Sequence, residues 1–275
     1  ALVALVVPTP TRSMTHRDAE AVPAMFRRVF SFSDLWRLDL GIFSLHLILT
    51  ALFLSIPLVL RDLGLAPVQH STLYLPVMLL SLVAMVPFVI IAEKRGMMKQ
   101  VLLGAVAALS LAQFALGMFA SAFWGFVGAL LVFFTAINLL EAVMPSLVSK
   151  VAPVDAKGTA MGVYSTSQFA GAFVGGLVGG TVHQHFGLTA VFEAGALVAL
   201  IWLLVASGMR KPGRYSSRLV NLDSVDDGGD LVDRLLRVPG VVEAVVVADE
   251  GVAYLKVDRE RLDDVALDEI VARPA

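Results

Sequence analysis

The sequence has no cysteine and few charged residues for its length. Only 16% of its 275 residues are Asp, Glu, Lys or Arg, whereas soluble domains average about one quarter. The absence of cysteine excludes disulfides, thiolate metal ligands and cysteine nucleophiles. The hydrolase patterns His-Glu-x-x-His and Gly-x-Ser-x-Gly are absent too. We therefore do not expect an enzyme.

Long apolar runs take the place of charge. Hydrophobic residues make up 57% of the chain, and the mean hydropathy is +0.81. Six runs are each near the ~20 residues that cross the hydrocarbon core of a bilayer. We predict six transmembrane helices, at residues 40–60, 72–92, 101–121, 125–149, 158–182 and 188–209.

The basic residues of the loops predict the orientation of these helices. Segments 9–38, 93–100, 150–157 and 210–218 together hold 14 Lys and Arg, whereas the opposite loops hold only Arg61. Basic loops face the cytoplasm. Because six spans return the chain to the side on which it started, we expect the C-terminal region to be cytoplasmic as well.

The composition changes near residue 219. Residues 1–218 carry 15 basic and 9 acidic residues, whereas residues 219–275 carry 6 basic and 14 acidic ones. Strand and helix patterns alternate in the second segment, with a hairpin signal at Asp249-Glu250-Gly251. The predicted order is βαββα, a small α+β ferredoxin-like domain that lacks its final strand. Its strands and helices are predicted at residues 219–222, 231–236, 241–248, 252–257 and 262–270.

Glu141 is the most unusual residue of the apolar part. It lies deep in the fourth predicted span, where an ionisable side chain is costly and indicates function by default. Asn138 and Thr135 precede it by one and two helical turns, so we expect all three on one face. Two interpretations of Glu141 stay open. It is either a proton or substrate site, or a neutral acid that only joins neighbouring helices by hydrogen bonds.

Other polar residues of the spans extend this candidate site. Ser165 and Gln168 are three residues apart on the fifth span, and His46 lies about two turns into the first. The candidate residues of a transport cavity are therefore Thr135, Asn138, Glu141, Ser165, Gln168 and His46.

Glycines on the fifth span indicate close helix packing. Gly171, Gly175 and Gly179 recur every four residues, which leaves a smooth face for another helix. Metal binding is not expected, because the pair His183 and His185 lacks a third ligand. We expect no cofactor, and because the C-terminal segment is acidic we expect no nucleic-acid partner.

The segment between the second and third spans carries a family motif. With Glu93, Lys94 and Gly96 it resembles the loop motif Asp-Arg-x-Gly-Arg-Arg of the major facilitator superfamily, although Met97 and Met98 replace its last basic residues. Residues 141–150 and 158–169 are similar to the helix 10–11 region of bacterial drug-efflux facilitators. Residues 250–258 resemble the small cytoplasmic domain of YajR-type transporters.

This resemblance implies the C-terminal half of a major facilitator fold, helices 7–12, with a missing N-terminal six-helix half. It divides the chain into residues 1–38 (the end of helix 6 at 1–7 and a cytoplasmic loop), 39–210 (six transmembrane helices), 211–218 (a linker) and 219–275 (the cytoplasmic domain). The implied location is the bacterial inner membrane, with the lipid bilayer as partner.

The implied function is proton-coupled efflux of small organic compounds by alternating access. The Glu93–Gly96 loop would then act as a conformational latch, and residues 219–275 would regulate or dimerise the protein. A non-transporting membrane receptor or scaffold, with a cytoplasmic partner-binding domain, is the alternative.

Overall fold

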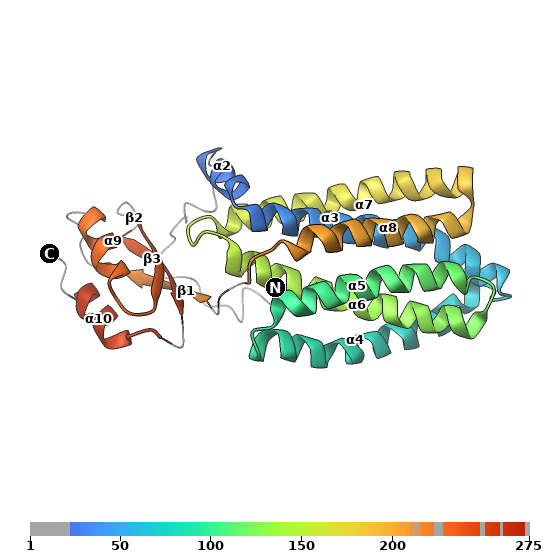
Figure 1. The fold of residues 1–275 in the computed structure, drawn as a ribbon, viewed down its shortest axis with the longest axis horizontal. Coiled ribbons are helices and arrows are strands. Elements are labelled where there is room, and N and C mark those ends of the chain that lie inside the picture. The colour runs from blue at the N-terminus through green and yellow to red at the C-terminus, as the bar shows by residue number, and fades with distance from the viewer. Residues whose placement is uncertain are drawn as a thin grey trace, which may run out of the picture. The chain divides into compact units, whose positions relative to one another are not determined.

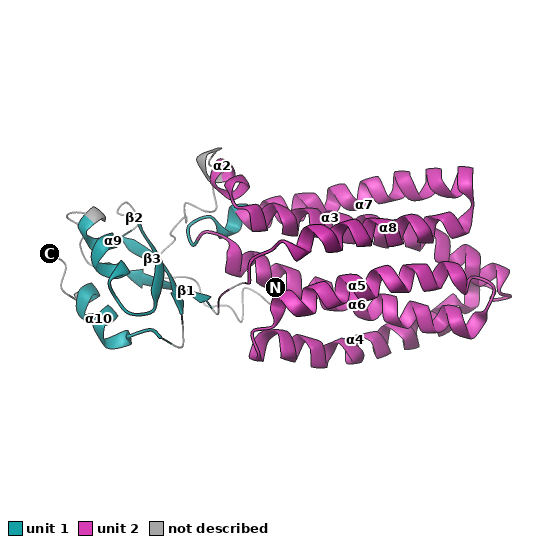
Figure 2. Ribbon diagram, viewed as in Figure 1, with its two compact units in different colours: residues 1–25, 154–159, 215–275 teal, residues 26–153, 160–214 magenta. Residues whose placement is uncertain are grey.

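The computed structural model describes residues 23–211, 213, 215–222, 228–247, 251–258 and 261–272. The expected end of a preceding helix at 1–7 and the expected turn residues Asp249 and Glu250 lie outside this part of the chain. The chain divides into two compact units (Figure 2). Residues 26–153 and 160–214 form the helical unit, and the other unit contains residues 215–275.

Six long helices form the helical unit (Figure 1), after a short helix α2, Pro23–Ser31. They are α3 Ser33–Asp62, α4 His70–Lys94, α5 Met98–Met118, α6 Phe123–Val151, α7 Lys157–Phe186 and α8 Leu188–Ser207. Each corresponds to one predicted span, with bounds that differ by a few residues. The polytopic helical fold expected from the sequence is therefore confirmed.

Five of these helices, all except α7, are long and apolar enough to cross a membrane by length and composition. Helix α7 has 30 residues, which at about 1.5 Å each exceeds the ~30 Å hydrocarbon core. Its glycines and polar side chains make it less apolar than the other five. Three of these glycines and one of the polar side chains also contact α3, as described below.

The helices pack against one another in one connected set. Helix α5 lies against α4, α6 and α8, α4 against α6, and α3 against α8 and α6. The largest buried side chains at these contacts are aromatic: Trp202, Phe126, Phe133, Phe134 and Phe192. Helix α4 buries only 17% of its most apolar window, against 56% for α3 and α6. Its exposed apolar surface therefore requires lipid or further helices as a partner.

The end of α4 shows why the loop motif contains a glycine. Gly96 has φ of +62°, a left-handed conformation that glycine adopts without steric cost. The amide of Met97 donates a hydrogen bond to the carbonyl of Ala92 at 3.1 Å, which closes the helix in the Schellman manner. Gly96 thus ends α4 and turns the chain into α5.

The small domain has the predicted βαββα order, which is confirmed. It consists of β1 Tyr215–Asn221, α9 Gly228–Leu236, β2 Val241–Val247, β3 Val252–Asp258 and α10 Asp264–Ala272. The sheet order is β1-β3-β2, and β3 is antiparallel to both neighbours, as is compatible with a ferredoxin-like topology. Leu235, Leu255 and Leu267 are fully buried in its core.

The first strand begins earlier than the sequence predicts. The expected linker 211–218 and strand 219–222 placed its start at residue 219, but β1 starts at Tyr215. Ser216 and Ser217 lack a strand-like apolar pattern, yet they pair with Val257 and Lys256 of β3. Backbone pairing with a central strand therefore overrides the weak local propensity of this segment.

Candidate functional site

Helices α3, α6 and α7 bring three of the predicted cavity residues together. His46 Nε2 lies 3.4 Å from Glu141 Oε1 and 2.9 Å from Gln168 Nε2. The other ring nitrogen, Nδ1, lies 3.3 Å from the carbonyl oxygen of Ile42. Residues that are 95 and 122 positions apart from His46 thus meet around one imidazole ring.

The partners of His46 define two hydrogen-bonding states. In the neutral ring, Nδ1–H donates to the Ile42 carbonyl, and Nε2 accepts from the amide of Gln168. In the protonated ring, Nε2–H becomes a donor and faces the carboxylate of Glu141. One proton therefore changes both the charge of the pair and the role of the Gln168 contact.

The carboxyl group of Glu141 is partly buried and lies beside His46. At 3.4 Å its contact with His46 is an ion-pair distance, and Oε1 is buried without a hydrogen-bond partner among the described residues. The side chain as a whole is 37% exposed, whereas that of His46 is 14% exposed. Glu141 is thus less buried than its partner His46.

Tyr164 lies near this site, and sequence reasoning missed it. Its side chain is only 3% exposed, and its hydroxyl is buried without a hydrogen-bond partner among the described residues. It lies within electrostatic range of Glu141 and Asp39. The available signal was its spacing, because Tyr164 precedes Gln168 by four residues and therefore shares its helix face. Ser165, the other predicted residue of α7, is half-buried.

Asn138 and Thr135 do not join this cluster. Asn138 Nδ2 donates to Ser81 Oγ of α4 at 2.8 Å. Thr135 donates to the carbonyl of Leu131 at 2.7 Å and lines a separate groove against α4 and α5. The expected common face with Glu141 was therefore wrong. Each step of three residues falls about 60° short of a full turn, so a stripe with this spacing winds around the helix.

The loop motif is tied to the end of α6. Glu93 accepts hydrogen bonds from Ser146 Oγ at 2.8 Å and from Lys150 Nζ at 2.7 Å. Lys150 Nζ also lies 2.9 Å from the sulfur of Met98. Lys94, the second motif residue, is exposed. The acidic residue of the motif thus links the end of α4 to α6, while Gly96 provides the turn.

The three glycines of α7 face the backbone of α3. A Cβ atom at Gly171 would collide with Phe43, one at Gly175 would collide with Leu47, and one at Gly179 would lie 2.8 Å from Ala51. The two backbones therefore approach more closely than any side chain on α7 would permit. This approach lets Gln168 reach His46 across the interface.

These observations define a polytopic helical membrane protein with a polar, ionisable site between three helices. A family model described as Major Facilitator Superfamily matches residues 5–240. The chain therefore belongs to the Major Facilitator Superfamily, a family of transporters rather than enzymes. A second family model, the YajR YAM domain, matches residues 220–272.

Two curated relatives are transport proteins by name. The chain is 39% identical over 259 residues to "Inner membrane transport protein YajR" of Escherichia coli (strain K12). The matched region covers 94% of this chain and 57% of that protein. It is 24% identical over 183 residues to "Uncharacterized transporter" of Buchnera aphidicola (subsp. Baizongia pistaciae). This matched region covers 66% of the chain and 46% of that protein. The chain spans about half the length of these relatives. The resemblance found in the sequence is thereby confirmed.

Proposed function

We propose that the complete protein is a proton-coupled secondary transporter that exports small organic compounds. In this proposal the helical unit is one half of the transporter, and a further six-helix half completes it. The two halves rock around a central site and expose it alternately to either side of the membrane. The protein would lie in the bacterial inner membrane, with its C-terminal domain in the cytoplasm.

The contact between His46, Glu141 and Gln168 carries this proposal. Two ionisable groups are 3.4 Å apart on helices α3 and α6, at a depth where ionisable residues commonly serve as proton relays. Attraction between them exists only when His46 is protonated and Glu141 is ionised. A change in protonation therefore changes how strongly α3 and α6 attract each other.

Such a pair couples protons to conformation only if its stability differs between the inward-open and outward-open states. In the described arrangement Gln168 adds α7 to the pair, because its amide bonds His46 at 2.9 Å. We propose that proton binding and release at this cluster favour different arrangements of the two halves. Ser165 and Tyr164 would line the same path on α7, and Asn138 would hold α6 against α4.

Two further contacts support a rocking half. The glycine face of α7 lets α3 and α7 move as one body, since their backbones are in contact along Gly171, Gly175 and Gly179. The link from Glu93 to Lys150 is exposed and has a length of 2.7 Å, so it can open and close as a latch. Residues 219–275 would then regulate or dimerise the transporter.

Flux in proteoliposomes tests the proposal. The complete protein is reconstituted, a panel of small organic compounds is offered, and a proton gradient is imposed in either direction. We expect flux of at least one compound that reverses with the gradient. Flux that does not depend on the proton gradient would contradict proton coupling. Absence of flux for the whole panel would instead favour a receptor or scaffold.

A further inference from the structure

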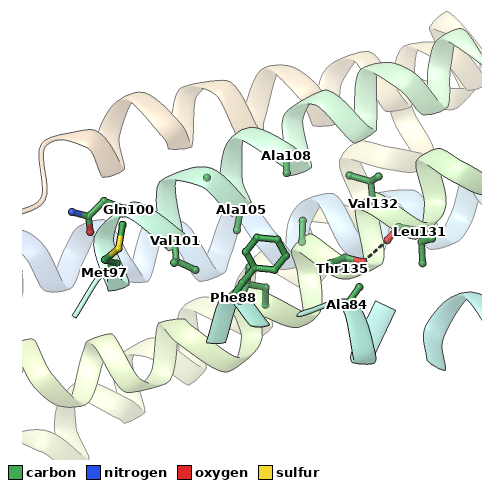
Figure 3. A pocket seen from close by; sticks show the side chains of 13 residues that line it. Ala84, Phe88, Met97, Gln100, Val101, Ala105, Ala108, Leu131, Val132 and Thr135 are labelled. Carbon is green, nitrogen blue, oxygen red and sulfur yellow. Dashed lines mark hydrogen bonds between the residues drawn. The ribbon is translucent and has the colours of Figure 1, made fainter. Parts of the chain in front are cut away.

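Helices α4, α5 and α6 enclose a groove that is separate from the ionisable cluster (Figure 3). Its volume is about 580 Å³, within the roughly 300–1,000 Å³ of small-molecule sites. Residues of all three helices line it, but His46, Glu141 and Gln168 do not. The groove therefore has no part in the proposed proton site.

The lining of the groove suits a hydrocarbon chain. Its polar side chains are Thr135 and Gln100. The hydroxyl of Thr135 already donates to the Leu131 carbonyl at 2.7 Å, so it offers little to a polar ligand. Gln100 lies at one end of the groove beside Met97 (Figure 3). A ligand would thus be apolar along its length and polar only at that end.

Small residues of α5 create the hollow. A Cβ atom at Gly104 would meet nothing within 4 Å, and Ala108 follows one turn later. From Gln100 to Ala108 the groove follows α5 for about 12 Å, at about 1.5 Å per residue. Phe88 and Val132 border it, and each is 47% exposed. The groove is therefore open at the surface of the described helices.

Basic residues lie at its polar end. The loop before α5 carries Lys94 and Arg95, both exposed, a few residues from Met97 and Gln100 of the lining. Lysine and arginine at a membrane surface attract anionic headgroups.

We propose that this groove binds one acyl chain of an anionic phospholipid, with the headgroup beside Lys94 and Arg95. The site is independent of the transport proposal, because it shares no residue with the ionisable cluster and its readout is lipid binding rather than flux. An apolar transported compound in the same groove is the competing occupant that the experiment must distinguish.

Photocrosslinking tests the site in the complete protein in bilayers. Phosphatidylglycerol and phosphatidylcholine, each with a diazirine in one acyl chain, are compared, and crosslinks are mapped by mass spectrometry. We expect phosphatidylglycerol to label α5 and α6 in the groove. Gly104→Leu should lower this labelling about tenfold, since a filled groove must distort to admit a chain. Gly128→Leu is the matched control. Gly128 also has open space at its Cβ position but does not line the groove.

A second pair of variants tests the headgroup. Arg95→Gln should lower labelling by phosphatidylglycerol about fivefold, while Arg61→Gln, in the last turn of α3, should leave it unchanged. Equal labelling by both lipids, or equal labelling of Gly104→Leu and wild type, would overturn the proposal. Displacement of both lipids alike by a transported apolar compound would overturn it as well, and would assign the groove to that compound.

Discussion

The close approach of α7 to α3 makes Gly175→Ala an informative perturbation. The added Cβ would lie against the carbonyl oxygen of Leu47 and 2.7 Å from its Cα. Both atoms belong to the backbone, so no side-chain rotation relieves the contact and the two helices must separate. Overpacking of this kind costs about 1–3 kcal/mol, which exceeds the gain of about 1 kcal/mol from replacing glycine by alanine in a helix.

Gly180→Ala is the matched control for this substitution. Gly180 lies on the same helix, but a Cβ atom there would meet nothing within 4 Å. The Gly180→Ala variant should therefore show only the stabilisation that comes from the higher helix propensity of alanine. The two variants are compared by thermal unfolding of the complete protein in detergent, where 1 kcal/mol corresponds to about 2–4 °C for a domain of this size. We expect Gly175→Ala to melt several degrees below Gly180→Ala. Equal melting temperatures would refute the close packing of α3 and α7.

Three further predictions concern other contacts. A double-mutant cycle with Asn138→Ala and Ser81→Ala should give a coupling energy of about 0.6 kcal/mol, the average for hydrogen bonds between membrane helices. A coupling energy of zero would contradict the hydrogen bond between α4 and α6. A cycle with Glu93→Gln and Lys150→Met should give less than about 1 kcal/mol and weaken in high salt; a salt-independent value would contradict an exposed pair. Leu267→Ala should destabilise the small domain by about 2–5 kcal/mol, seen as faster amide exchange in β3, whereas unchanged exchange would contradict the described core.

Much of the fold could be predicted because its signals are local. Each apolar run was long enough to be a membrane helix, and each became one of the helices α3 to α8. Glycines with a spacing of four residues stay close to one helix face, and the face formed by Gly171, Gly175 and Gly179 meets a neighbouring backbone. The βαββα order followed from alternating patterns and turn residues in the same way.

The site was less predictable because it depends on contacts between helices. His46, Glu141 and Gln168 were each recognisable as polar residues in apolar spans, but their meeting required the packing of α3, α6 and α7. Thr135 was misplaced because a spacing of three residues rotates steadily around a helix. Tyr164 was missed because a tyrosine in an apolar run is ordinary until its hydroxyl is found to be buried without a hydrogen-bond partner among the described residues.

The central claim is that Glu141 couples protons to transport, and one comparison tests it most directly. Glu141→Gln and its control Glu193→Gln, an exposed acid of α8, are reconstituted in the complete protein. Flux driven by a proton gradient and exchange of labelled compound without a gradient are both measured. We predict that Glu141→Gln loses the response to the gradient but retains exchange, while Glu193→Gln keeps both. A wild-type response to the gradient in Glu141→Gln would contradict the claim.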